Sequence, residues 1–164
     1  MIAALLPGVG LGNKVPVLLD DGDDPLAAAR RAALLAANLN AFAFDFVLRQ
    51  KLQGQTINLF ILEQLPVVAP AAFDAKLGKT TIADFVRGAV RPPFAWDEAD
   101  RRRRMARLDA LFMLLYGEAR DDAAYILDTF PIVREKNEAA HGRYLTRELV
   151  LDYMDRLAAG DLAP

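Results

Sequence analysis

The sequence predicts an α+β fold that is mainly helical, with small β elements near the N-terminal half and a group of helices toward the C-terminus. Apolar residues recur at three- and four-residue steps over most of the chain, which is the period of an amphipathic helix. Short runs of β-forming residues bounded by glycine or proline occur in the first 70 residues. With 164 residues, 54% of them hydrophobic and 26% charged, the chain can form one ordinary globular domain.

Two β-like pieces open the chain, Ile2–Leu6 and Val15–Leu19, with a glycine-rich segment between them. This pattern predicts a hairpin. An isolated hairpin is barely stable, so it should pair with more sheet, either from elsewhere in the chain or from residues upstream of it. We therefore expect a compact fragment of a larger protein.

An acidic cluster, Asp20–Asp24, follows the predicted hairpin. A calcium loop needs a distal carboxylate at a fixed spacing, and none follows here, so a solvated turn is favoured over a metal site. Asp24 is expected to cap the next helix, with Pro25 at its first position, where a missing N–H is tolerated.

From Pro25 to about Leu52 the pattern predicts one helix with a wide apolar face. Its phenylalanines, Phe42, Phe44 and Phe46, are interpreted as core residues in preference to base-stacking aromatics, which would need exposure.

The predicted helix ends in a group of polar side chains beside Gly54, which we call the polar rim. Arginine and lysine suit guanine, and glutamine and asparagine suit adenine, so these residues are candidates for DNA contact. The alternative is a solvated helix end with Gly54 as its C-cap and the cations at the negative end of the helix dipole. The polar rim consists of Arg49, Gln50, Lys51, Gln53, Gln55 and Asn58.

After the polar rim, Thr56–Leu62 is rich in β-formers with apolar residues on both faces, which predicts a buried strand. A short helical turn over Leu59–Leu65 is the competing prediction, because short apolar runs are ambiguous. Pro66 and Pro70 then end the unit and begin a connector.

In the second half, one helix should start near Asp97 and stop at Gly117, another should cover Asp121–Thr129, and the last should run from Thr146 to Gly160. Within the first of these, Arg101–Arg104 points around the whole helix, and acidic residues lie four positions before several of the arginines. The favoured interpretation is a solvated helix face with salt bridges. A phosphate-binding face that includes Arg107 is the alternative.

Short matches to cofactor and catalytic motifs fail on their chemistry. The glycines of Gly8–Gly12 precede a β-rich run where a cofactor loop should open a helix. Arg91–Phe94 has the two prolines and the aromatic residue of the methyltransferase catalytic motif. The first residue of that motif must accept a hydrogen bond from the adenine amine, and an arginine side chain has only donors. Gly78–Thr80 is similar to the end of a phosphate-binding loop, but that motif needs a glycine five positions before Gly78, where this sequence has Phe73. His141 is the only histidine and is expected in a surface loop, so no enzyme site is predicted.

Two stretches carry a family resemblance: NLNAFAFDFVLRQKLQGQTINLFILEQLP, Asn38–Pro66, and YILDTFPIVREKNE, Tyr125–Glu138. Together they resemble the C-terminal end of N6-adenine DNA methyltransferases of restriction-modification and phage-defence systems, of type I and type IIG-like organisation. In that family the target-recognition region often closes with a helix, an RQK-like basic end, a small polar turn and an apolar segment ending in LP. The resemblance extends less specifically over nearly the whole chain.

The resemblance implies that residues 1–70 are the distal part of a target-recognition-like region and that residues 71–164 are a C-terminal helical region. The chain would contribute DNA recognition and helical support, while S-adenosylmethionine would bind in a separate upstream methyltransferase domain. No cofactor is expected in this chain. The alternative is a noncatalytic interaction module, which would dock another domain through the apolar stripes Leu108–Leu115 and Leu149–Leu157.

Charge and composition limit these roles. A formal net charge of −2 and a pI near 5.4 predict weak DNA binding by the chain alone, because cations supply nonspecific affinity. Base readout within a larger basic protein remains compatible with that charge. The absence of cysteine excludes disulfides and thiolate metal sites and fits a reducing cytoplasm. No membrane association is expected, since prolines and glycines break the apolar start.

Overall fold

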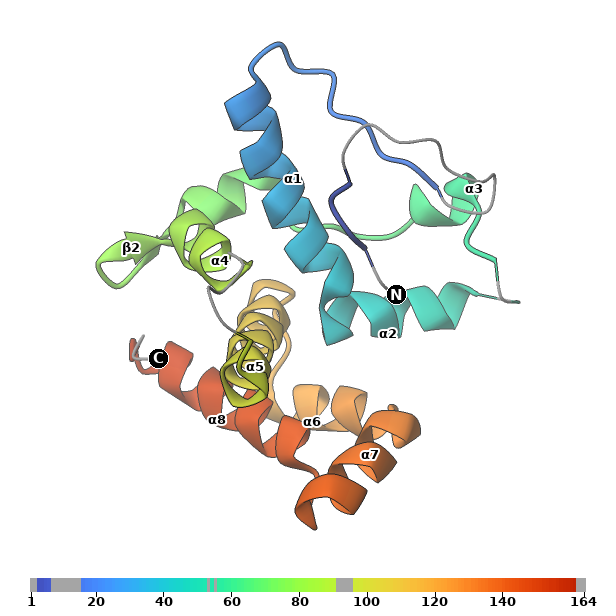
Figure 1. Ribbon diagram of the computed structural model, residues 1–164, viewed down its shortest axis with the longest axis vertical. Helices are drawn as coiled ribbons and strands as arrows, with labels where there is room; N and C mark the ends of the chain where they lie inside the picture. The colour runs from blue at the N-terminus through green and yellow to red at the C-terminus, as the bar shows by residue number, and fades with distance from the viewer. Residues whose placement is uncertain (1–2, 7–15, 53, 55, 91–95, 162–164) are drawn as a thin grey trace.

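The structure, a computed structural model, describes residues 3–6, 16–52, 54, 56–90 and 96–161. Within these ranges the fold is mainly helical with one small two-stranded sheet, as the sequence predicts (Figure 1). The helices are α1 Pro25–Asn40, α2 Phe42–Lys51, α3 Leu59–Leu62, α4 Ile82–Val90, α5 Glu98–Leu115, α6 Arg120–Asp128, α7 Pro131–His141 and α8 Leu145–Ala158, with a 3-10 turn at Pro70–Asp74.

The sheet is a hairpin in which β1 (Lys76–Leu77) pairs antiparallel with β2 (Thr80–Thr81). Its two-residue connection begins with Gly78, whose φ of 60° is left-handed. Such short hairpin connections favour glycine at a left-handed position. The small β element lies at the end of the N-terminal half, after the two segments in which the sequence analysis expected strands.

The predicted N-terminal hairpin is wrong for its described parts, because residues 3–6 and 16–19 are not in strands. The sheet that the described residues form, β1–β2, does not include these segments, so it offers them no strand edge. The side-chain amide of Asn40 instead accepts a hydrogen bond from the Ala3 N–H (3.0 Å) and donates one to the Ala3 carbonyl (2.9 Å). This amide substitutes for a strand partner at Ala3.

The predicted strand Thr56–Leu62 is also wrong, and the competing helical interpretation holds over Leu59–Leu62 as α3. The carbonyl of Asn58 accepts hydrogen bonds from the N–H groups of Ile61 (3.0 Å) and Leu62 (3.1 Å). One helical turn satisfies these groups locally, which a strand without a neighbour would not do.

The helix predicted from Pro25 to Leu52 begins as expected but is broken at Ala41. The Asp24 carboxylate accepts a hydrogen bond from Leu26 N–H at 2.9 Å, and Pro25 occupies the first turn. Ala41 has extended backbone angles (φ −71°, ψ 146°), and α1 and α2 bend by 65°. Among the described residues no single helix is long and apolar enough to cross a membrane. The bent pair α1 and α2 meets the criteria only when the two helices are taken together, by length and composition alone.

The break is stabilised from a distance by Asp109 of α5. Ala41 caps α2 with no side-chain hydrogen bond, and the buried Asp109 carboxylate accepts one from Phe42 N–H at 2.9 Å instead. A carboxylate at a helix N-terminus satisfies an otherwise unpaired N–H and interacts favourably with the helix dipole.

The ends of α5 follow local signals. The Asp97 carboxylate accepts hydrogen bonds from the N–H groups of Ala99 (2.8 Å) and Asp100 (3.1 Å), and Gly117 follows the helix with a left-handed φ of 80°. The start and stop predicted for this helix are confirmed.

Helix α7 was not predicted, and α8 begins earlier than the predicted Thr146 N-cap. His141 is the final residue of α7, not part of a loop, and Gly142 follows it with a φ of 69°. Thr146 is inside α8, whose N-cap is Tyr144. Asn137 explains the earlier start, because its side-chain oxygen accepts hydrogen bonds from the Thr146 N–H (2.7 Å) and hydroxyl (2.8 Å).

Two apolar clusters hold the fold together. The larger one, which we call the helical core, centres on α5 packed against α8 and includes residues of α1, α2, α4 and α6 (Figure 1). The smaller one, the rim cluster, consists of the buried residues Leu39, Phe44, Leu48 and Leu65. Phe44 is fully buried, and Phe42 and Phe46 pack on the helical core, so the predicted core role of the three phenylalanines is confirmed.

Candidate nucleic-acid interface

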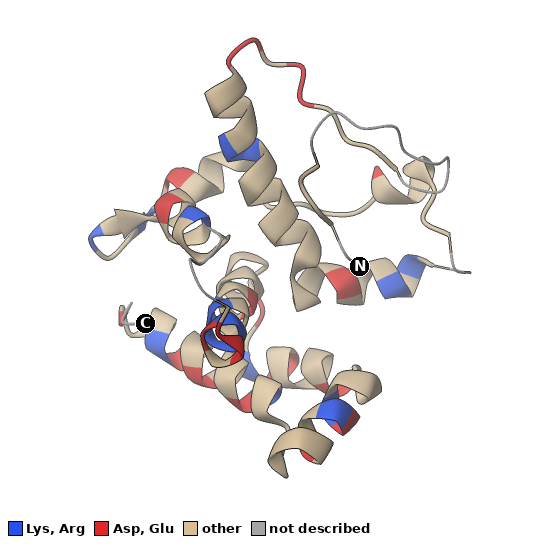
Figure 2. Cartoon of the chain, viewed as in Figure 1, with Lys and Arg blue, Asp and Glu red and all other residues tan. Residues whose placement is uncertain are grey.

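The polar rim lies at the C-terminal end of α2 and at the start of α3. The structure describes Arg49, Gln50, Lys51 and Asn58, while Gln53 and Gln55 lie outside the described residues. In Figure 2 the C-terminal end of α2 carries basic positions, preceded along the helix by one acidic position, Asp45.

Arg49 is engaged within the protein. Its Nε and Nη2 atoms each lie 2.9 Å from an Asp45 carboxylate oxygen, and its guanidinium lies 4.3 Å from the centre of the Phe130 ring. The side chain nevertheless keeps 51% of its surface exposed. Arg49 therefore links α2 to the start of α7 and presents only part of its guanidinium to a ligand.

Gln50 and Lys51 are exposed in the last turn of α2. The C-cap of the helix is Leu52, whose N–H donates to the Leu48 carbonyl at 3.0 Å, so the expected Gly54 cap is wrong. A cation in the last turn interacts favourably with the negative end of the helix dipole. Lys51 thus combines a structural role with free reach into solvent.

Asn58 is exposed at the N-terminus of α3 and makes no side-chain capping bond there. Its neighbours Ile57 and Ile61 pack against the rim cluster, which also contains Leu48 of α2. The described polar rim residues therefore stand on one small apolar unit.

A buried polar network fixes the connector after this unit, and the sequence analysis did not identify it. The Asn38 side chain donates to the Tyr116 hydroxyl (2.8 Å) and accepts from Val68 N–H (2.8 Å). Tyr116 in turn donates to the Pro66 carbonyl at 2.8 Å, and burial raises the pKa of Tyr116. The sequence did contain a clue to this network, because Asn38 lies within an apolar stretch of the predicted helix and a buried amide requires hydrogen-bond partners.

The two stretches that carry the family resemblance are neighbours in space. Phe42 and Phe130 meet edge to face with ring centres 4.7 Å apart, and Phe46 and Tyr125 do so at 6.3 Å. Together with Arg49 over Phe130, these contacts pack α2 against α6 and the start of α7. The second stretch thereby supports the helix that carries the polar rim.

Asp109 is the most perturbed carboxyl described. Complete burial raises its pKa to about 7, and the hydrogen bond from Phe42 N–H partly opposes that rise. Its position under the α1–α2 break gives it a structural role at the start of α2, away from the polar rim.

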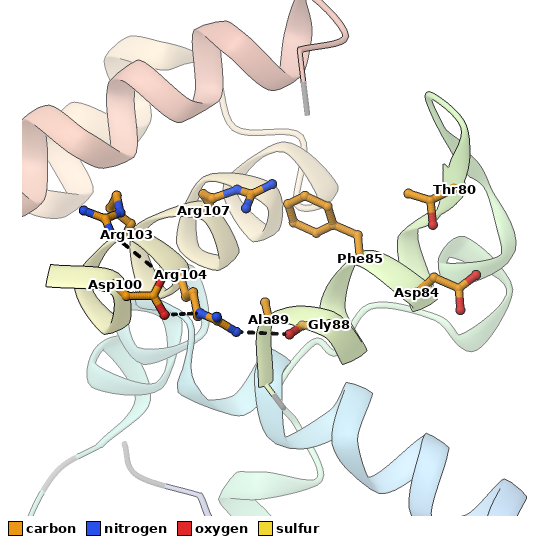
Figure 3. A pocket seen from close by; sticks show the side chains of 9 residues that line it. All are labelled: Thr80, Asp84, Phe85, Gly88, Ala89, Asp100, Arg103, Arg104 and Arg107. Atoms are coloured by element: carbon orange, nitrogen blue, oxygen red, sulfur yellow. Dashed lines mark hydrogen bonds and ion pairs between the residues drawn. The ribbon is translucent and has the colours of Figure 1, made fainter. Parts of the chain in front are cut away.

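The arginine run of α5 forms some of the predicted ion pairs. Arg104 lies 2.6 Å from Asp100, as the four-residue spacing predicts, whereas Asp97 caps the helix and Arg101 pairs with Glu98 at 3.5 Å. Arg103, Arg104 and Arg107 line a cleft between α4 and α5 (Figure 3). Sequence spacing did not predict this cleft.

The described residues hold no candidate metal cluster, and they include only one of the rejected motif matches. No group of three or more potential metal-binding side chains occurs among them. Gly78–Thr80 forms the connection and second strand of the β1–β2 hairpin, while Gly8–Gly12 and Arg91–Phe94 lie outside the described residues.

The chain was compared with protein family models, curated proteins and solved structures. None of these comparisons gives a match.

Proposed function

We propose that this chain is the C-terminal, target-recognition part of an N6-adenine DNA methyltransferase of a restriction-modification or phage-defence system. It contributes DNA recognition and helical support, and an upstream domain of the same enzyme binds S-adenosylmethionine and carries out the methyl transfer. The enzyme acts in the cytoplasm on DNA.

The observation that carries this proposal is the division within residues 38–66. Four apolar residues of this segment, Leu39, Phe44, Leu48 and Leu65, form the buried rim cluster, whereas Gln50, Lys51 and Asn58 are exposed beside it. Donors and acceptors held on a packed base can read base edges without rearrangement of the backbone. Arg49, already paired with Asp45, has the smaller role of a partly exposed support.

The alternative, a noncatalytic interaction module, rested on two apolar stripes available for docking. These stripes lie on α5 and α8, which pack extensively against each other. Leu111, Phe112, Val150 and Leu157 of the two stripes are buried within the helical core. The stripes are therefore occupied inside the chain, and the methyltransferase proposal is favoured.

The first test is the coding sequence upstream of this chain. We expect, in the same reading frame, a glycine-rich cofactor loop and an Asn/Asp-Pro-Pro-aromatic motif. An upstream sequence without both would contradict the proposal.

The second test uses the complete gene product. Lys51→Ala and Gln50→Ala should lower site-specific adenine methylation, measured by sequencing of modified DNA from cells that express each variant, while thermal stability stays unchanged. Lys136→Ala on α7 is the matched control, because Lys136 is also exposed but lies outside the polar rim. Unchanged methylation and target preference in both rim variants would reject the assignment.

A further inference from the structure

A pocket beside the α1–α2 break lies away from the polar rim, and we call it the junction pocket. Its volume is about 320 Å³, at the small end of the range for ligand pockets. The C-terminal half of α1 and three residues of α5, Met105, Leu108 and Asp109, form most of it, with residues 3–5 and Val90 at the end of α4 beside them. None of the described polar rim residues lines this pocket, so a role for it does not rest on the proposed function.

The junction pocket has a buried floor and an open mouth. Its most enclosed lining residues are Ala37, Ala41 and Asp109, which are 6%, 3% and 5% exposed. Leu5 and Met105 are 59% and 42% exposed and lie at the mouth. A compound can therefore enter from solvent and reach the floor while α1 and α5 stay in place.

Two polar side chains, Asn40 and Asp109, interrupt an otherwise apolar lining. The Asn40 amide is engaged with the backbone: it accepts from the Ala3 N–H and donates to the carbonyls of Ala3 and Ala36. Asn40 thereby fixes residue 3 against α1 and completes the wall. Asp109 is the polar lining group that remains for a ligand.

The carboxyl group of Asp109 is only partly used by the protein. Its Oδ1 accepts the Phe42 N–H at 2.9 Å, and no hydrogen bond or ion pair from the described residues reaches Oδ2. Among the described residues, Arg147 Nε is the one side-chain polar atom sealed from solvent without a hydrogen bond, so Oδ2 is not sealed. Oδ2 is therefore an accessible acceptor at the floor of the pocket.

The surroundings of this acceptor favour a positively charged ligand. Asp109 is the one ionisable side chain among the described lining residues. The C-terminal ends of α1 and α4 border the pocket, and this end of a helix carries partial negative charge. The last turn of α1 has no basic residue, and Arg87 in the last turn of α4 is paired with Asp84.

The buried carboxyl group also lacks a compensating cation. Burial raises the pKa of Asp109 to about 7, and the hydrogen bond from Phe42 N–H opposes that rise only in part. A buried carboxylate without a counterion is costly, whereas an ammonium group brought to it forms a charge-assisted hydrogen bond. An apolar body attached to that ammonium group would cover the apolar walls.

We propose that the junction pocket binds a small organic amine, whose ammonium group donates to Asp109 Oδ2 and whose apolar body packs against Leu108 and the alanines of α1. An alcohol of the same shape covers the same walls but gives the carboxylate no counterion. Charge at Asp109 therefore decides which ligand is bound, and the small volume limits the ligand to a compact molecule.

The test uses the full chain with two amines, hexylamine and phenethylamine, and their uncharged counterparts, hexanol and phenethyl alcohol. Calorimetry measures binding at pH 8, where Asp109 is ionised. Asp109→Asn removes the charge and keeps an acceptor for the Phe42 N–H, while Asp122→Asn removes a charge from an exposed position of α6. Ala36→Leu fills the pocket, and Ala29→Leu adds the same side chain at an exposed position of α1 outside the lining.

We expect the wild type to bind at least one amine about 10-fold more tightly than its alcohol, which corresponds to one hydrogen bond to a charged group. Asp109→Asn should lose this preference, Ala36→Leu should weaken binding of both compounds, and the two control variants should bind like the wild type. Equal binding of amine and alcohol by the wild type, an unchanged preference in Asp109→Asn, or no binding of any probe at millimolar concentration would overturn the proposal.

The pH dependence gives a second readout. The carboxylate is the form that binds an ammonium group, and an alkylamine stays protonated over this range, so amine affinity of the wild type should rise by about 10-fold from pH 6 to pH 8. Alcohol binding should not rise with it. Circular dichroism checks folding, and if Asp109→Asn is unfolded the wild-type pH series decides, because an amine affinity that does not change with pH rejects the proposal.

Discussion

The helical core and the rim cluster achieve stability in different ways. The helical core buries large residues of many elements, with Phe112, Met113, Leu127 and Val150 fully or almost fully enclosed. The rim cluster, as described, has four buried residues. Next to it, the side chains of Asn38 and Asp109 accept hydrogen bonds from the backbone N–H groups of Val68 and Phe42. The comparison shows that a surface unit can be held in place by a few buried polar groups when its own apolar area is small.

The largest effect should come from a matched pair of phenylalanines. Phe112→Ala in the helical core and Phe44→Ala in the rim cluster both empty a fully buried site. Each should lower the free energy of unfolding by about 3–5 kcal/mol, with Phe112→Ala at the upper end because it lies in the larger cluster of buried residues. Urea denaturation measures both values.

Hydrogen exchange distinguishes the two regions further. Phe44→Ala should increase exchange in α2 and α3 while α5 and α8 remain protected, because a small cluster opens locally. Uniformly increased exchange in all helices would show that the two clusters unfold as a single unit.

The second effect concerns Asp109, whose pKa is raised to about 7 in the folded protein. A raised carboxyl pKa means that the folded state holds the proton more tightly than the unfolded state. The resulting stability is fully present below about pH 4 and is lost as the pH rises to about 7, a change on the order of 4 kcal/mol.

Asp109→Asn should abolish this pH dependence, because an amide oxygen can still accept the Phe42 N–H without a charge. Urea denaturation between pH 4 and pH 8 tests this expectation, with a substitution of the exposed Asp122 of α6, Asp122→Asn, as the control. An equally steep pH dependence in wild type and Asp109→Asn would contradict the assigned role.

A smaller effect is expected at the network that joins the regions. Asn38→Ala leaves the half-buried Val68 N–H without its partner and should cost about 1–3 kcal/mol. Tyr116→Phe removes only the hydroxyl and should cost about 1 kcal/mol. Thermal melts measure both, and a larger loss in Tyr116→Phe than in Asn38→Ala would reverse the order of importance.

The smallest effect should occur at Arg49. Arg49→Ala removes a half-exposed ion pair and a contact with the Phe130 ring, together worth about 1 kcal/mol. Arg49→Lys should retain part of this stability, because lysine keeps the charge but lacks the planar group. A chemical denaturation difference of several kcal/mol would show that Arg49 is a main support of the fold.

Much of the candidate interface could be predicted from sequence, because exposed polar residues after an apolar helix are a local pattern. The exposure of Gln50, Lys51 and Asn58 follows that pattern. The contact between the Arg49 guanidinium and the Phe130 ring could not be predicted from a local pattern, since Phe130 lies 81 residues further along the chain. The cleft at Arg107 likewise required the packing of α4 on α5.

The sequence by itself determined where helices start and stop when the signal is short-range. Asp24 and Pro25 begin α1, and Asp97 and Gly117 bound α5, because caps act within a few residues of one another. Only the tertiary structure decided that a continuous helical pattern breaks at Ala41. The partner of the freed Phe42 N–H is Asp109, a residue far away in sequence, and a buried polar group takes whichever partner the fold brings to it.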